Sequence, residues 1–241
     1  MNGSTLFMNS DEPNFVWNNY NAVSDMGCII EKEIMETSPL KRYESTEITG
    51  RHGELHETFD DYEAYDLEIK DITIPYDNLR MVKNWLRGFG KLITHNDFDK
   101  YRECICNMKK GVEFENEWGV FYTFSIVFRC QPFRKKVRET AIPLISGLNS
   151  FTDHGDETSQ PYLEIVCKGG NIDLQMDDKK LTVINPMSGL ITVDNEKGKV
   201  MQGDYPLFTK GDWLKNNPGQ SSIKITGNFS SAKLFVRSVW L

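Results

Sequence analysis

Two histidines, His52 and His56, stand four residues apart in the stretch TGRHGELHETFDDYEAYD, residues 49–66, and carboxylates surround them. On a helix this spacing places two imidazoles on one face, where they can bind a metal ion. Gly50 and Gly53, however, flank the first histidine and favour a tight turn. On a strand, residues four apart lie about 13 Å from each other, too far to share one ion. The pattern therefore predicts a polar hairpin, and we assign no metal site to it.

The other groups that could do chemistry are scattered. His95 stands near Asp97 and Asp99 in an acidic turn, but a calcium loop needs more oxygen ligands in a fixed pattern. The cysteines are odd in number, and their only close pair is Cys-Ile-Cys, which favours reduced core residues over disulfides or a zinc site. They are Cys28, Cys104, Cys106, Cys130 and Cys167. We find no catalytic residues, no cofactor-binding motif and no metal ligands, so the sequence indicates a structural or binding protein and no enzyme.

Charge and composition narrow the function further. The 241 residues are 39% hydrophobic and carry a net charge of −7, which disfavours a protein that binds nucleic acid specifically. Residues 44–71 hold ten acidic side chains against Arg51 and Lys70, so much of the acidity belongs to one segment. No signal peptide and no apolar run long enough for membrane insertion is recognisable, which predicts synthesis in a cytoplasm without export by the usual route.

Strands dominate the first half of the chain. We expect them over 27–34, 43–49, 65–74, 91–94, 101–108 and 119–130, with one helix over about 77–87. The alternation of apolar residues in 65–74 changes phase near Lys70 and Asp71, which predicts a bulge. The helix should bury Leu79, Val82, Leu86 and Phe89. Tyr122, Phe124, Ile126 and Phe128 should line the core face of their strand.

A linker is expected over QPFRKKVRE, residues 131–139, because a proline and a basic run stand there. Seven or eight short strands with turn signals between them follow, and no helical pattern interrupts them. This predicts an antiparallel β-sandwich. The expected domains are therefore residues 1–135, which are β-rich with one helix, and residues 136–241, the sandwich.

Five segments stand in a recognisable order along the chain: MGCIIEKE, TGRHGELHETFDDYEAYDLEI, NLRMVKNWLRGFGKLITHNDFDKYRECI, FSIVFRCQPFRKK and MQGDYPLFTKGDWLKNNPGQSSIKITGN. A short strand with Arg237 ends the chain. In this order the segments resemble the distal tail proteins of long-tailed siphophages, the Sipho_tail family. The likeness covers roughly residues 15–241, although Thr49 and His52 stand where proline and aspartate are common in the corresponding turn of the family.

The resemblance implies a mainly β fold: an N-terminal β-rich ring-forming domain with one α-helix, followed by a galectin-like antiparallel β-sandwich. It implies a virion structural protein at the tail tip of a bacteriophage, a baseplate hub that assembles as a homohexamer around a channel for DNA. Its implied partners are the tail tube or tape-measure protein and the tail-associated tip protein, and receptor-binding proteins can attach around such a ring.

The candidate ring-interface or lumen residues all lie in the acidic segment. If they line the lumen, their charge would repel DNA and let the genome slide past. They are Arg51, His52, Glu54, His56, Glu57, Asp60 and Asp61.

One alternative is a carbohydrate-binding module of a phage or prophage tail that contacts glycans on the host surface. Trp213 stands in a loop and could stack on a sugar or contact a partner protein, although the residue set that galectins use is not recognisable. A cell-wall hydrolase is a weaker alternative, since no catalytic set stands out.

Overall fold

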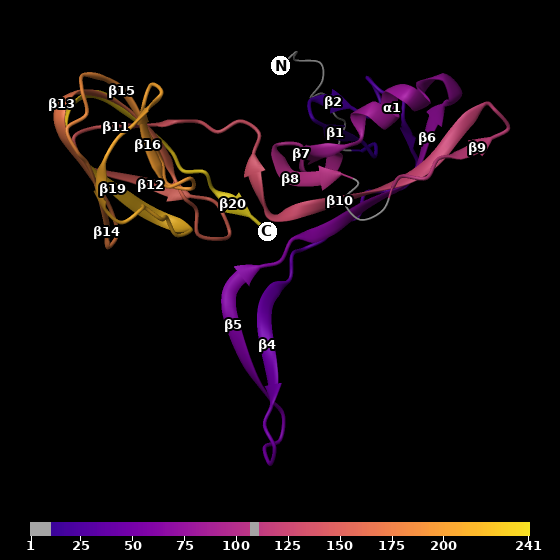
Figure 1. Cartoon of the computed structure of the whole chain (residues 1–241), viewed down its shortest axis with the longest axis horizontal. Coiled ribbons are helices and arrows are strands. Elements are labelled where there is room, and N and C mark those ends of the chain that lie inside the picture. The colour runs from indigo at the N-terminus through magenta and orange to yellow at the C-terminus, as the bar shows by residue number, and fades with distance from the viewer. Residues whose placement is uncertain (1–10, 107–110) are drawn as a thin grey trace. The chain divides into compact units, whose positions relative to one another are not determined.

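The computed structural model describes residues 11–106 and 111–241, and most of them lie in antiparallel strands (Figure 1). The chain divides into two compact units. Unit 1 comprises Met1–Arg134 with Leu241, and unit 2 comprises Lys135–Trp240. That each unit folds independently stays a prediction.

Unit 1 is built around one antiparallel sheet with the strand order β2-β1-β7-β8-β10-β6-β3, and β9 pairs with the outer part of β10. The strands are β1 (Phe15–Trp17), β2 (Tyr20–Asn21), β3 (Ile29–Ile30), β6 (Tyr65–Pro75), β7 (Gly88–Thr94), β8 (Lys100–Cys106), β9 (Glu115–Glu117) and β10 (Phe121–Lys136). Residues 107 and 108, expected as the end of a strand, lie outside the described residues.

A short helix covers the core face of this sheet. The turn η1 (Tyr76–Asn78) leads into α1 (Leu79–Trp85). Trp85 stacks on Phe15 with ring centroids 5.4 Å apart, and its indole N–H donates to the Trp17 carbonyl at 2.8 Å. The strand β10 contributes Phe124, Ile126 and Phe128 to the same core, as the alternation predicted.

The predicted bulge is present in β6. The register between β6 and β10 shifts between Ile69 and Ile72, and Asp71 has a φ of 52°. Because the bulge adds a residue, Leu67 and Ile69 before it and Ile72 after it all point into the core. The confirmed phase change therefore keeps an eleven-residue strand buried on one face along its whole length.

The predicted helix is too long at both ends. Residues 76–78 form a 3-10 turn, and Asn78 donates its side-chain amide to the Met26 carbonyl, 3.0 Å away, instead of capping the helix. The segment Gly88-Phe89-Gly90 already belongs to β7, so Phe89 lies on a strand and is 79% exposed. Its expected place in the core was wrong because the helical period ends before it.

Two strands form a separate sheet. β4 (Lys41–Glu47) pairs with β5 (Glu54–Tyr62) in an antiparallel hairpin, the purple stalk of Figure 1. This confirms the polar hairpin predicted from the spacing of its glycines and histidines. We call residues 41–62 the arm.

Unit 2 is an antiparallel β-sandwich. Its strands are β11 (Ile142–Leu144), β12 (Gly147–Asp153), β13 (Tyr162–Met176), β14 (Lys179–Val183), β15 (Gly189–Asp194), β16 (Lys199–Gln202), β17 (Tyr205–Pro206), β18 (Thr209–Gly211) and β19 (Gly219–Phe235). The short strand β20 (Val239–Trp240) follows them and belongs to neither layer of the sandwich. One layer contains β12, the first part of β19, the second part of β13, β14 and β18. The other contains β11, the remaining parts of β19 and β13, and β15–β17.

Two long bent strands join these layers, where the sequence predicted four short ones. Gly169 and Gly170 have φ values of 102° and 84°, and Gly227 has a φ of 133°. The register between β13 and β19 shifts between Cys167 and Ile172, on either side of the first two glycines. Glycine thus bends both strands without ending them. The linker expected over residues 131–139 is correct only in part, because residues 131–136 continue β10, although the boundary between the units falls within this segment, after Arg134.

Candidate interaction surfaces

The arm exposes both of its faces. Every residue from 41 to 60 is exposed, so no other element in the described part of the chain covers this stretch of the two-stranded sheet. At the base of the arm, Tyr62 packs edge to face against Phe133 with ring centroids 5.5 Å apart. An isolated hairpin is only marginally stable in water. A surface of this size without a covering layer is therefore a candidate for contact with another molecule.

Like charges oppose each other across the arm. Glu44 lies directly opposite Glu57, and Glu47 lies directly opposite Glu54. Such pairs destabilise a hairpin, each by a few tenths to about 1 kcal/mol. Within residues 11–106 and 111–241, the structure pairs none of these four carboxylates with a cation. The charge is therefore available to an external cationic surface.

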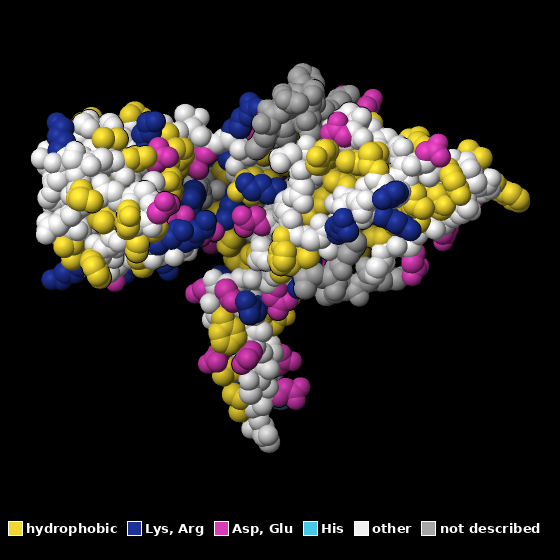
Figure 2. All heavy atoms as spheres, turned by 45° about the horizontal axis from the view of Figure 1, so that its top comes forward, with side chains coloured by type: hydrophobic (Ala, Val, Ile, Leu, Met, Phe, Trp, Pro, Cys, Tyr) yellow, Lys and Arg dark blue, Asp and Glu magenta, His cyan; other side chains and the backbone are white. Residues whose placement is uncertain are grey.

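The two faces of the arm differ in their apolar content. Leu55 and Phe59, 40% and 55% exposed, share the face of Glu57, because side chains on a strand alternate. Tyr43 lies on the opposite face with His56, and their rings meet edge to face at 6.0 Å. Figure 2 shows hydrophobic and acidic side chains next to each other along the arm.

The candidate residues from the sequence occupy different levels of the arm. Arg51 and His52 lie in the turn at its tip, whereas Asp60 and Asp61 lie at its base. There Asp60 pairs with Lys41 at 3.0 Å, and Asp61 pairs with Arg42 at 2.7 Å. Glu54, His56 and Glu57 lie between these levels on β5.

The histidines of the arm have polar surroundings rather than a ligand cage. The Nδ1 atom of His56 lies 2.7 Å from the Ser45 hydroxyl. Among the described residues, no three His, Cys, Asp or Glu side chains gather where they could hold a metal ion together. The carboxylates of Asp97 and Asp99 near His95 are bound by Lys100, at 2.8 and 3.1 Å.

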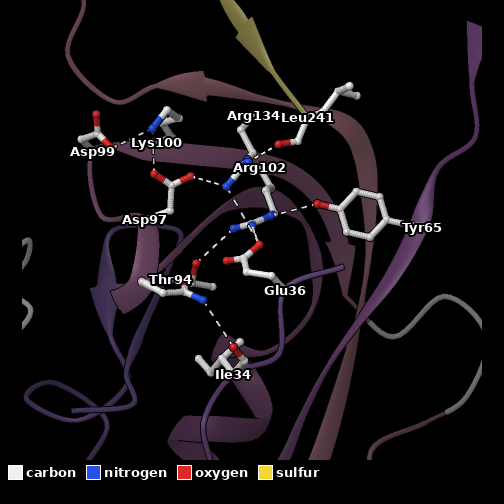
Figure 3. A network of polar contacts seen from close by, with 11 residues as sticks. Ile34, Glu36, Tyr65, Thr94, Asp97, Asp99, Lys100, Arg102, Arg134 and Leu241 are labelled. Carbon is white, nitrogen blue, oxygen red and sulfur yellow. Dashed lines mark hydrogen bonds and ion pairs between the residues drawn. The ribbon is translucent and has the colours of Figure 1, made fainter. Parts of the chain in front are cut away.

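A buried arginine, missed in the sequence, connects the two roots of the arm (Figure 3). Arg102 on β8 is 1% exposed and donates to the Tyr65 hydroxyl at 2.9 Å and to the Thr94 hydroxyl at 3.0 Å. It also pairs with Glu36. Glu36 precedes β4 and Tyr65 opens β6, so Arg102 contacts the segments on both sides of the arm.

We call Arg102 and its contacts with Tyr65, Thr94 and Glu36 the clamp, and contacts of neighbouring residues extend it. The Nε2 atom of His95 lies 2.7 Å from Glu33, and Asn96 donates its side-chain amide to the Ile34 carbonyl at 3.3 Å. Arg134 pairs with Asp97 at 2.6 Å and donates to the carbonyl of Leu241. Burial alone would lower the pKa of Arg102, but attraction to Tyr65 and Glu36 outweighs it and raises the pKa. The guanidinium is therefore held charged between the roots of the arm.

Helix α1 and the residues after it present basic side chains. Arg80 and Lys83 lie on α1, Arg87 lies two residues beyond its last residue, Trp85, and all three are exposed. In the part of the chain that the structure describes, no carboxylate pairs with any of the three. Lys83 extends over the ring of Phe114, 5.1 Å from its centroid. Met81, on another side of α1, is 41% exposed.

Trp118 is a second feature that the sequence analysis missed. It lies in the turn between β9 and β10, has a φ of 57° and is 95% exposed. Exposed Val120 follows it. Tryptophan anchors many protein interfaces, so this turn is a further candidate contact. The signal in the sequence is Glu-Trp-Gly, a tryptophan directly before a turn glycine.

Trp213 has a different setting. It is half-buried, packs against the core of unit 2 and lies over Gly198. Glycan binding and a partner contact at Trp213 stay untested predictions.

Comparisons with known proteins show which known fold this chain has. No family model and no curated protein sequence matches this chain. Among the described residues, no helix is long and apolar enough to span a bilayer. The crystal structure of Dit from phage SPP1, described as a paradigm of the hub adsorption apparatus in phages that infect Gram-positive bacteria, is similar over 95% of this chain and 99% of that one. The TM-score is 0.73 and the sequence identity is 13%. The chain therefore has the fold of this Dit protein, mainly β with one short helix and a galectin-like β-sandwich.

Proposed function

We propose that this protein is a structural, non-enzymatic hub of a bacteriophage tail tip. The observation that carries the proposal is the fold match to SPP1 Dit, which extends over both units of the chain. Two unrelated domains rarely follow each other in the same order by chance, so the match favours a shared architectural role over a shared module alone.

In this role, six copies form a ring through unit 1 and leave a channel for DNA. The ring joins the tail tube or tape-measure protein to the tail-associated tip protein, and receptor-binding proteins attach around it. The protein is made in the bacterial host cytoplasm and resides in the virion at the tail tip. In such a ring, one surface of each copy binds a different surface of the next copy, and the rotation between neighbouring copies must close the ring, as in a siphovirus tail hub.

The arm supplies the interface or lumen residues of this ring. Its exposure on both faces and its unpaired glutamates support this assignment. A lumen lined by Glu47 and Glu54 would repel the DNA backbone and keep the genome from binding to the wall. A reconstruction of the hexamer with residues 54–68 on its outer surface would exclude the lumen role.

The first test is the mass of the purified full chain, by light scattering after size exclusion, with negative-stain images of the same peak. We expect rings of six copies or stacked pairs of rings. A monomer at every concentration would contradict self-assembly of the hub. A glycan array with Trp213→Ala as its control would then decide whether unit 2 acts as a binding module.

A further inference from the structure

The arm face formed by Glu44, Leu55, Glu57 and Phe59 combines two properties of an interface. Two glutamates oppose each other on it, and two apolar side chains flank Glu57 along β5. The residues between 41 and 60 are exposed throughout, so the chain's own helix α1 does not cover this face. A partner for it must offer cations together with some apolar surface.

The outer surface of α1 has these properties. Arg80 and Lys83 on α1 and Arg87 just after its end provide three positive charges, and Met81 exposes apolar area on the neighbouring side of the helix. The chain thus carries an acidic, partly apolar strand surface and a basic, partly apolar helix surface, neither paired within its described residues. Their complementarity identifies a second copy of this chain as the partner.

We propose that the arm of one copy docks on helix α1 of the next copy, with Glu44 and Glu57 facing Arg80, Lys83 and Arg87. This contact rests on the proposed hub function and specifies its interface. It also assigns the two arm faces different roles, because the pair Glu47 and Glu54 on the other face stays uncovered.

The dimensions of the two surfaces agree. Glu44 and Glu57 lie directly opposite each other, so their Cα atoms are about 5 Å apart across the two strands. Arg80 and Lys83 lie about 4.5 Å apart along the axis of α1. The cations of the next copy would lie beside Glu44 and Glu57 and offset the repulsion between these two carboxylates, which destabilises the isolated arm.

The contact is heterologous, because the arm and the helix are different surfaces of the same chain. Each copy donates one arm and accepts another, so the contact can repeat around an axis and close into a ring. A symmetric dimer would require two such contacts at once between the same two copies.

Charge reversal tests the contact on the full chain. One variant carries Glu44→Lys and Glu57→Lys, which keeps a like-charge pair across the arm and so leaves its intrinsic stability nearly unchanged. The other carries Arg80→Glu, Lys83→Glu and Arg87→Glu, which exchanges one good helix former for another at the two positions on α1. Each variant alone should self-associate about 100-fold more weakly than the wild type, because like charges then meet.

Mixing the two variants is the decisive step. The lysine arm then meets the glutamate helix, and the unchanged arm meets the unchanged helix. We expect the 1:1 mixture to regain the assembly size of the wild type by sedimentation velocity, with the two variants alternating. The control carries Asp204→Lys and Lys210→Glu, two exposed residues of unit 2, and should assemble like the wild type.

A zero-length cross-link identifies the residues that are in contact between copies. A carbodiimide joins a carboxylate to an amine in direct contact, so Lys83 should couple to Glu44 or Glu57. Mixing ¹⁴N- and ¹⁵N-labelled wild-type chains shows by mass whether the two peptides come from different copies. We expect inter-copy products that disappear in both reversal variants.

The outcomes separate the two proposals. If both variants still form rings, or if wild-type rings give no cross-link from Lys83 to the arm, the arm–helix contact is overturned and the hub function is left intact. A wild type that stays monomeric, with no inter-copy product at any concentration, overturns both the contact and ring formation by this chain.

Discussion

The clamp at the roots of the arm makes a sharp prediction about Arg102. This side chain is 1% exposed and binds Tyr65, Thr94 and Glu36, which belong to three separate segments. Replacing it by methionine keeps an unbranched apolar stem of similar length and removes every charged hydrogen bond. We expect Arg102→Met to destabilise unit 1 and to loosen the arm.

The magnitude follows from the partners that would be left behind. The hydroxyls of Thr94 and Tyr65 are buried, and each would lose a hydrogen bond to a charged donor, at about 1.5 kcal/mol or more. The Glu36 side chain is partly exposed and can be hydrated again, so it adds little. The expected loss is therefore about 3 kcal/mol, or roughly 10 °C in the Tm of a unit of this size.

Thermal and urea unfolding of the full chain measure this loss, and hydrogen exchange locates it. The amides of β4 and β5 should exchange faster in Arg102→Met, because both roots of the arm are released. Arg129→Met is the matched control: Arg129 pairs with Asp66 at 3.1 Å on the same sheet, but both side chains are partly exposed. Such a pair contributes at most about 1 kcal/mol.

A loss in Arg102→Met no larger than that in Arg129→Met would refute the reasoning. It would mean that the two hydroxyls find other partners or water once the guanidinium is gone. An unchanged exchange rate in the arm, together with a clear loss of stability, would refute only the link between the clamp and the arm.

Three further outcomes are expected. Burial alone would raise the pKa of the Asp194 carboxyl, but the Arg237 guanidinium, 2.9 Å away, holds it below its usual 3.8. The stability that this ion pair contributes is therefore present above about pH 4 and is lost as the pH falls through the lower pKa of the folded state. The cost of Arg237→Met in urea unfolding should shrink in acid. Gly211→Ala should destabilise unit 2 in thermal unfolding, because the new methyl group meets a backbone carbonyl of β14, whereas Gly147→Ala, at a similar positive φ in open space, should cost less. Burial raises the pKa of the Cys28 thiol to about 12, so Ellman's reagent should modify it at pH 8 only after denaturation.

Local patterns in the sequence predicted the features that depend on near neighbours. The hairpin at 41–62 follows from glycines and polar alternation, and the bulge at Asp71 follows from a change of apolar phase. Glycine caused the error in the strands of unit 2. It ends a strand in a hairpin but bends one at Gly169 and Gly227, and the sequence looks alike in both cases.

The clamp depends on contacts that no local pattern reveals. Arg102 meets Tyr65 and Glu36 across 37 and 66 residues of sequence. A lone arginine in a strand is more often a solvated residue, and only the completed sheet shows that it is buried between the arm roots. That no carboxylate in the described residues pairs with Arg80, Lys83 or Arg87 likewise appears only in the folded unit.

The continuity of the arm with the sheet has a mechanical consequence. Only Glu63 and Ala64 separate β5 from β6, and β6 pairs with β10 through nine residue pairs between Tyr65 and Pro75. A pull on the arm along this strand direction loads those pairs in shear, so they share the force at once instead of breaking one after another. We therefore expect the arm to transmit tension into unit 1 through β6 without separating β6 from β10 one residue pair at a time.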